Sequence, residues 1–223
     1  MPITHVFDPV EFSIDVAFTL IAVIFCFLIY FKTRESYELT KYEGIKYFRG
    51  AFFFFGLSYL LRFFLSLVIL SKIAFDFILP REMFAPFFIL FLGYFSTIGI
   101  FYLIFSSIWD KFQKKQLLLW GHVIAIILSV ISFLTRSHFI LLALQFVFLI
   151  AAMIFSFVIE KERKKITKIR VLYFLVCILW LLNLLTIDHD RGRFFSIDVD
   201  LYSQIISLVV FIIIYYKISK WVK

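Results

Sequence analysis

Seven long apolar segments take up most of this 223-residue chain, and they restrict the folds open to it. A helix rises 1.5 Å per residue, so about 20 apolar residues cross the hydrocarbon core of a bilayer. None of the segments alternates with period two as a barrel strand does, and in lipid every backbone polar group must be bonded. The sequence therefore predicts an all-α integral membrane protein, a seven-transmembrane-helix bundle forming a single domain over residues 1–223. The predicted helices are Phe12–Phe31, Tyr47–Leu70, Met83–Ile108, Leu117–Leu134, His138–Ile159, Ile169–Ile187 and Leu201–Ile218, of which the fourth and seventh are the shortest.

The composition agrees with a lipid-facing exterior. Hydrophobic residues make up 63% of the chain, and 33 phenylalanines stand against 7 glycines and 4 prolines, so the helices should be bulky and mostly unbroken. A soluble domain is only about half apolar. No basic residue precedes the first apolar segment and no small-residue cleavage site follows it, so we expect a retained span and not a signal peptide.

Lysine and arginine gather at one set of helix ends, and this bias predicts the orientation. The connections after the first, third and fifth segments, together with the C-terminal end, hold 17 basic residues, and the opposite set of ends holds five. The positive-inside rule places the richer set in the cytoplasm. The N-terminus is then outside and the C-terminus cytoplasmic, as an odd number of spans requires. We expect the plasma membrane as the location.

The net charge of +8 follows from this topology. Basic residues at the cytoplasmic surface contact anionic head groups, and no connection is long enough to fold as a soluble nucleic-acid-binding module. The connection Glu160–Arg170 is the best candidate contact for a separate protein partner or for acidic lipid, the alternative being a topology signal alone. Its basic residues are Lys161, Arg163, Lys164, Lys165, Lys168 and Arg170. The connection Lys32–Lys46 is predicted to be a solvated loop or, second, a short interfacial helix.

Arg62 lies inside the second predicted helix, roughly 22 Å beyond Tyr47 at its start, somewhat past the midplane. An arginine at depth costs about 2.5–3.5 kcal/mol on insertion scales, so it should face the bundle and have a partner. Asp15, near the outer end of the first helix, is the expected partner. Two interpretations are open: an ion pair that only holds the first two helices together, or part of a ligand or ion site.

Other polar residues lie at a similar depth in the outer half of the predicted bundle. Together with Arg62 and Asp15 they predict an outward-facing ligand pocket, although interhelical hydrogen bonds alone explain many residues of this kind. The residues are Tyr59, Gln145, Asn183, Tyr202 and Gln204. Small residues should instead mark close helix contacts, namely Gly50, Gly56, Ser58 and the pair Gly93 and Thr97.

No cofactor is predicted. A bis-histidine haem needs two imidazoles at one depth, whereas His122 lies toward the cytoplasmic end and the other three histidines lie near the outer surface. The run Asp188–Asp190 resembles a metal-binding cluster, but Arg191 and Arg193 follow at once and would oppose a cation. Both cysteines lie inside apolar spans and read as small core residues. No HExxH, GxSxG or P-loop motif is present, which argues against an enzyme.

A bundle of seven helices with its N-terminus outside resembles receptors and microbial rhodopsins, and the resemblance is one of topology only. A rhodopsin holds retinal on a lysine in the middle of its last helix, and Leu201–Tyr216 contains no lysine, so no covalent retinal is expected. The sequence favours a non-enzymatic receptor or sensor. The alternatives are a small transporter or permease, which the low glycine and proline counts weaken, and a structural subunit of a larger membrane complex.

Overall fold

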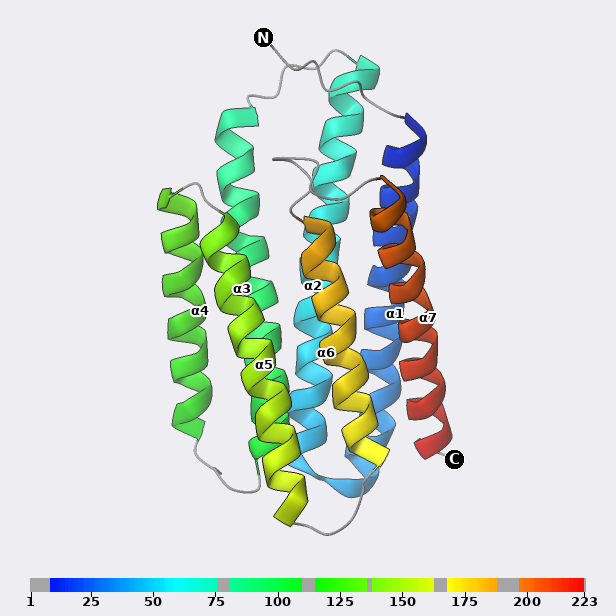
Figure 1. Ribbon diagram of the computed structural model, residues 1–223, viewed down its shortest axis with the longest axis vertical. Coiled ribbons are helices and arrows are strands. Elements are labelled where there is room, and N and C mark those ends of the chain that lie inside the picture. The colour runs from blue at the N-terminus through cyan, green and yellow to red at the C-terminus, as the bar shows by residue number, and fades with distance from the viewer. Residues whose placement is uncertain are drawn as a thin grey trace.

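The computed structural model of the protein describes residues 9–75, 81–109, 115–135, 138–162, 168–187 and 197–222. These residues form seven α-helices and no strand (Figure 1). Each of the seven apolar segments is a helix, as predicted, and most helices run past the predicted ends. The helices are α1 (Pro9–Thr40), α2 (Glu43–Phe75), α3 (Arg81–Ile108), α4 (Lys115–Thr135), α5 (His138–Glu162), α6 (Lys168–Ile187) and α7 (Ile197–Val222).

Within the described residues, five helices are long and apolar enough to cross a membrane, and they mark the chain as a multi-pass membrane protein. They are α1, α2, α3, α4 and α7. In α5 and α6 the described apolar segments are shorter, at Leu141–Ile154 and Val171–Leu182. The fourth and seventh predicted spans, the shortest in the sequence, are among the five helices that are long enough.

The connection between the first two helices is not a solvated loop, which corrects that prediction. Helix α1 continues to Thr40 and α2 begins at Glu43, so two residues make the turn. Lys41 has a positive φ of 51° and its N–H donates to the carbonyl of Tyr37 at 2.7 Å, a left-handed helix cap. The added helical turns carry opposite charges three or four residues apart, a spacing that stabilises helices. These ion pairs are Lys32–Glu35, Arg34–Glu38 and Lys46–Glu43.

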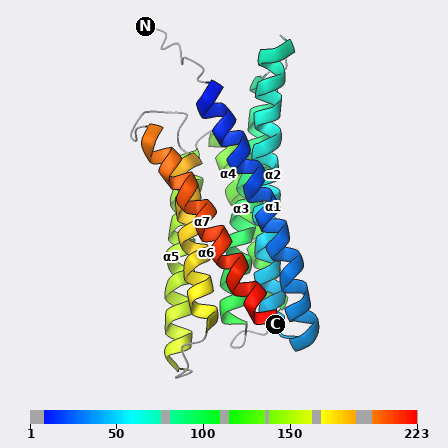
Figure 2. The same cartoon turned by 90° about the vertical axis from the view of Figure 1, so that its right-hand side faces the viewer.

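Six of the helices form a closed ring, and α4 lies outside it. Around the ring α1 contacts α2, α2 contacts α3, α3 contacts α5, α5 contacts α6, α6 contacts α7, and α7 returns to α1. Helix α4 packs mainly on α3, at the left edge of the bundle in Figure 1. The turned view in Figure 2 shows α7 crossing obliquely beside α1 and α6. Helix α1 begins at one end of the bundle and α7 finishes at the other.

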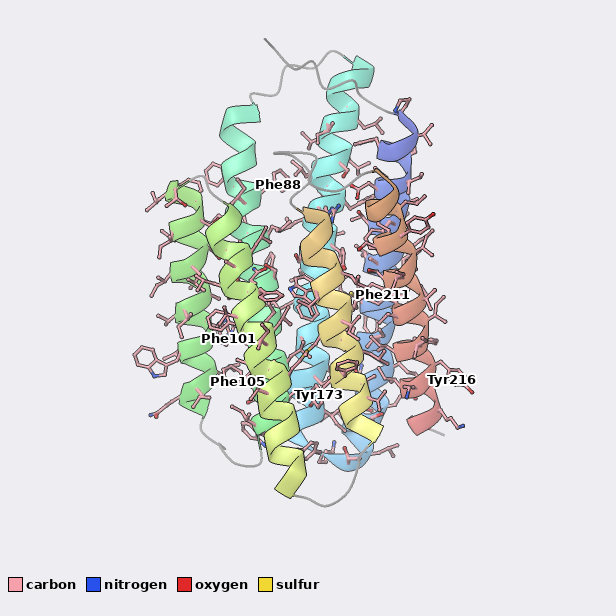
Figure 3. The ribbon with its side chains drawn as sticks, in the orientation of Figure 1. Phe88, Phe101, Phe105, Tyr173, Phe211 and Tyr216 are labelled. Atoms are coloured by element: carbon pink, nitrogen blue, oxygen red, sulfur yellow. The ribbon has the colours of Figure 1, made fainter. Side chains whose placement is uncertain are left out.

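Small residues allow α4 to approach α3 closely. Its buried face carries Gly121, Ala125 and Ser129, four residues apart, while the opposite face is apolar and exposed. A Cβ on Gly121 would lie 3.0 Å from the ring of Phe105. Figure 3 shows Phe105 and Phe101 inside the bundle and Tyr216 projecting away from α7. The exposed apolar face of α4 suits contact with lipid.

The predicted close contacts at three glycines are confirmed. A Cβ on Gly56 would lie 3.2 Å from Cys26 Cβ on α1. A Cβ on Gly50 would overlap the ring of Tyr102, and one on Gly93 would lie 2.9 Å from Leu141 Cδ2. The glycines on α2 therefore allow it to approach α1 and α3 closely, and Gly93 on α3 allows α3 to approach α5.

Gly56→Val is expected to destabilise the protein by about 1–3 kcal/mol, because the added methyl groups overlap Cys26 and Phe27 at the α1–α2 contact. The measurement is the thermal unfolding midpoint in mild detergent. Ala17→Val adds methyl groups on the exposed face of α1 and serves as the control. Equal midpoints for the two variants would contradict the close contact.

Candidate functional site

Three polar side chains from α1, α2 and α7 meet near the start of α1, and we call this group the clasp. Arg62 Nη2 donates to Asp15 Oδ1 at 2.6 Å, so the predicted ion pair is present. The two side chains are 17% and 27% exposed. Arg62 lies fewer residues from the α1–α2 turn than Asp15 does, and its long side chain spans the difference.

Gln204 brings α7 to the same carboxylate. Its Nε2 donates to Asp15 Oδ1 at 3.4 Å, a longer contact than the one with Arg62. Gln204 is buried, and its Oε1 has no hydrogen-bond partner in the described part of the chain. One oxygen of Asp15 thus joins three helices that are far apart in sequence.

Aromatic rings from four helices lie one to two helical turns below the clasp, toward the α1–α2 turn. We call them the ring layer, which consists of Phe18, Phe55, Tyr59, Trp180 and Phe211. Phe18 follows Asp15 by three residues on α1, and Tyr59 precedes Arg62 by three on α2, so each shares a helix face with its clasp residue. The ring of Tyr59 is 6.2 Å from that of Phe18, 6.1 Å from that of Trp180 on α6 and 6.2 Å from that of Phe211 on α7. Trp180 stacks on Phe55 at 4.2 Å.

Two hydrogen-bond donors of the ring layer have no acceptor. The Tyr59 Oη and Trp180 Nε1 atoms are buried and lack a partner among the described residues. The two residues are only 2% and 1% exposed. A buried donor that forms no hydrogen bond costs about 1–3 kcal/mol of stability. Such donors are rare in native proteins and call for an explanation.

Gln145 belongs to a different contact, although the sequence grouped it with Arg62. Its Nε2 donates to Ser96 Oγ at 2.6 Å and to Thr97 Oγ1 at 3.0 Å, joining α5 to α3. Tyr202 is 62% exposed at the outside of α7. Asn183 lies in α6, three residues after Trp180, and its side chain is outside the described residues. The structure therefore gathers Arg62, Asp15, Tyr59 and Gln204 and leaves Gln145 and Tyr202 elsewhere.

The predicted basic contact region lies largely outside the described residues. Helix α5 reaches Glu162 and α6 begins at Lys168, so both extend beyond the apolar segments. Lys161, Lys168 and Arg170 lie on these helices with side chains that are not described. Arg163, Lys164 and Lys165 fall between the described ranges, as does the run Asp188–Asp190.

A second polar contact ties the α1–α2 turn to the helices beside it. Ser106 Oγ on α3 donates to the carbonyl of Gly44 at 2.5 Å and also forms a short hydrogen bond with Tyr173 Oη on α6. Phe48 packs edge-on against Tyr173 at 5.7 Å. Gly44 lies in the first turn of α2, 18 residues before Arg62, so this contact is roughly 27 Å from the clasp along α2, toward the other end of the bundle.

Sequence reasoning missed Trp180, Phe211 and the Ser106–Tyr173 contact. The chain has 33 phenylalanines, so one aromatic residue inside a span does not stand out from its neighbours in the sequence. No partner was predicted for His122. Its Nδ1 shares a 2.8 Å hydrogen bond with Tyr94 Oη, which joins α4 to α3. The only signal available for Trp180 was its spacing of three residues from Asn183, which puts both on one face of α6.

Comparison with known proteins finds a relative that matches nearly the whole chain. The chain is 30% identical over 218 residues to an uncharacterized protein of Archaeoglobus fulgidus, and the match covers 95% of this chain and 94% of the archaeal protein. No protein-family model and no solved structure matches the chain. The chain belongs to the same family as the archaeal protein, over nearly its whole length.

Arg62→Leu and Asp15→Asn are each expected to lower the free energy of unfolding by about 1–3 kcal/mol, between the values typical of exposed and of buried ion pairs. The double variant should lose less than the sum, because neither charge is then left without its partner. Denaturation in mild detergent gives the free energies of unfolding of the wild type, the two single variants and the double variant, and hence the coupling between the two residues. Arg34→Leu and Glu38→Gln break an exposed pair of the same 2.6 Å length and should change the midpoint little. Additive losses at Arg62 and Asp15 would contradict the coupling.

Proposed function

We propose that this chain, as a member of the same family as the Archaeoglobus fulgidus protein, is a non-enzymatic membrane receptor or sensor. In this proposal it has seven spans in the cell membrane, takes a small or lipidic ligand at the clasp, and passes the change to a separate protein at its basic cytoplasmic connections. The observation that carries the proposal is the clasp itself, in which one carboxylate joins three helices through two donors.

The proposed topology has its N-terminus outside. The bias of 17 basic residues against five supports it, and so does the placement of the start of α1 and the end of α7 at opposite ends of the bundle (Figure 1). The clasp then lies in the outer half of the membrane, and the Ser106–Tyr173 contact lies at the cytoplasmic side.

The proposed ligand carries a carboxylate or a phosphate. A guanidinium has five N–H donors in a planar fork that matches either group in a bidentate manner. Such an anion competes with Asp15 for Arg62. When it binds, Asp15 loses its cation, and the link that joins α1 to α2 and α7 is weakened. The ligand thereby acts on the relative position of three helices and not on one side chain.

Aromatic contacts connect the two ends of the bundle in this scheme. From Tyr59 and Trp180 the contacts pass to Phe55, then to Phe52 at 6.3 Å and to Phe48 at 5.1 Å. Phe48 meets Tyr173, whose hydroxyl bonds Ser106 beside the α1–α2 turn. Tyr173 lies in the first turns of α6, next to the basic connection that is the proposed partner surface. A packed series of this kind can carry coupling between distant sites.

A structural subunit is the second candidate function, and one observation favours it. Arg62 and Asp15 already satisfy each other at 2.6 Å, as a pair that only holds helices together would. The two candidates differ in what an added anion does. A receptor binds it at Arg62, whereas a structural pair ignores it.

The topology predicts the labelling of two introduced cysteines. Ser13→Cys at the start of α1 should react with a membrane-impermeant maleimide on intact cells, and Thr40→Cys should react only after lysis. Both positions are exposed, and the native Cys26 and Cys177 are buried, so background labelling should be low. The reverse pattern would contradict the proposed orientation.

Dodecyl phosphate should raise the thermal unfolding midpoint of the detergent-extracted protein in a saturable manner, because a ligand that binds the folded state stabilises it. The uncharged dodecanol should have no comparable effect. Arg62→Leu should abolish the response, and Asp15→Asn should reach half-saturation at roughly tenfold lower concentration, because the competing carboxylate is gone. Arg34→Leu is the matched control and should respond as the wild type does. An unchanged response in Arg62→Leu would contradict the ligand site.

A further inference from the structure

The two donors without acceptors lie where the proposed ligand would extend. Tyr59 is three residues from Arg62 on the same face of α2, which places it about 4.5 Å further into the bundle. Trp180 faces it from α6, with ring centroids 6.1 Å apart. Tyr59 Oη and Trp180 Nε1 are the only buried donors beside the clasp, within the described residues, that lack an acceptor.

The residues around these donors are apolar. Phe18, Phe55 and Phe211 contact Tyr59 or Trp180 through their rings and offer no oxygen or nitrogen. A molecule that meets Arg62 with its charge and continues inward therefore meets two neutral donors set among hydrocarbon. Only a group with an acceptor oxygen, attached to an apolar body, satisfies both features at once.

We infer that the ligand is an amphipathic anion with an ester or ether oxygen about one helical turn below its charged head, and that Tyr59 and Trp180 donate hydrogen bonds to that oxygen. This inference rests on the proposed function, because it assumes that the charged head binds Arg62. Glycerolipid phosphates have this chemistry, with a phosphate, a neighbouring ester or ether oxygen and a long apolar chain.

The clasp lies between the start of α1 and the donor of Tyr59. Asp15 and Arg62 lie one turn above Phe18 and Tyr59 on their own helices, and Tyr59 is buried with Trp180 packed against it at 6.1 Å. Displacement of Asp15 from Arg62 therefore opens the way to Tyr59 and Trp180. The ligand supplies in one molecule the anion that releases the clasp and the acceptor that the donors lack.

The test compares two probes that share a charged head and a twelve-carbon chain. Lauroyl-glycerol-3-phosphate has a carboxylic ester on the glycerol next to its phosphate, and dodecyl phosphate has no acceptor oxygen beyond those of the phosphate group. Binding of each probe to the full-length protein in mild detergent is measured by titration of the thermal midpoint. The wild type should bind the glycerol phosphate roughly tenfold more tightly, as two additional neutral hydrogen bonds would give.

The informative variants remove one donor and keep the ring. Tyr59→Phe and Trp180→Phe should each reduce the preference for the glycerol phosphate by about threefold or more, with binding of dodecyl phosphate unchanged. Without ligand, Tyr59→Phe should unfold at the same or a higher temperature, because it deletes a hydroxyl that has no partner. Tyr94→Phe is the control: its hydroxyl bonds His122, so its loss should lower the unfolding temperature and leave the preference intact.

The possible failures are distinguishable. Equal affinity for the two probes in the wild type, or an undiminished preference in both Tyr59→Phe and Trp180→Phe, would overturn this inference while the site at Arg62 stands. Dodecyl phosphate binding that survives in Arg62→Leu, or the absence of binding by either probe, would overturn the proposed function and this inference together.

Discussion

The ion pair between Arg62 and Asp15 is the interaction on which the arrangement of the helices around the start of α1 depends. Neither charge is stable alone in an apolar span, and the 2.6 Å contact lets each neutralise the other. Because the partners lie on α1 and α2, the pair fixes the position of these two helices, and the bond from Gln204 adds α7. Most other helix contacts here are made by small residues and aromatic rings, whose packing does not fix one position of a helix along its neighbour as a charge pair does.

In the proposed function the same pair makes the site responsive to an anion. A carboxylate held by one arginine can be replaced by another anion of similar geometry, whereas a packed phenylalanine cannot. The unpartnered donors of Tyr59 and Trp180 add a second reason to expect a ligand, since buried polar groups without partners are selected against unless they serve a purpose. A purely structural clasp would account for the ion pair but would leave these two donors without an explanation.

Part of this structure could be predicted from the sequence. The seven helices follow from apolar length, and Asp15 as the partner of Arg62 follows from the energetic cost of an isolated charge in lipid. Depth along a span could also be estimated, but depth does not give the face. For that reason Gln145 was grouped with Arg62, although it bonds Ser96 and Thr97 on α3.

Other features were indicated by residue spacing, but the overall composition of the chain made that spacing hard to recognise. The pairs Lys32–Glu35 and Arg34–Glu38 have helical spacing, yet the high charge of their segment favoured a loop. The position of α4 outside the ring is consistent with Gly121, Ala125 and Ser129 on one face, a pattern that is visible only once the partner helix is known. Trp180 and Phe211 were not distinguishable from the many other aromatic residues of the spans, because the contacts of a ring depend on tertiary packing.

Native mass spectrometry of the protein, extracted in a mild detergent without added ligand, tests the central claim most directly. The account predicts a stoichiometric small anionic adduct on the wild-type chain that is absent from Arg62→Leu and retained by the matched control Arg34→Leu. A bare wild-type chain, or the same adduct on Arg62→Leu, would contradict a ligand site at the clasp and leave Arg62 and Asp15 as a structural pair.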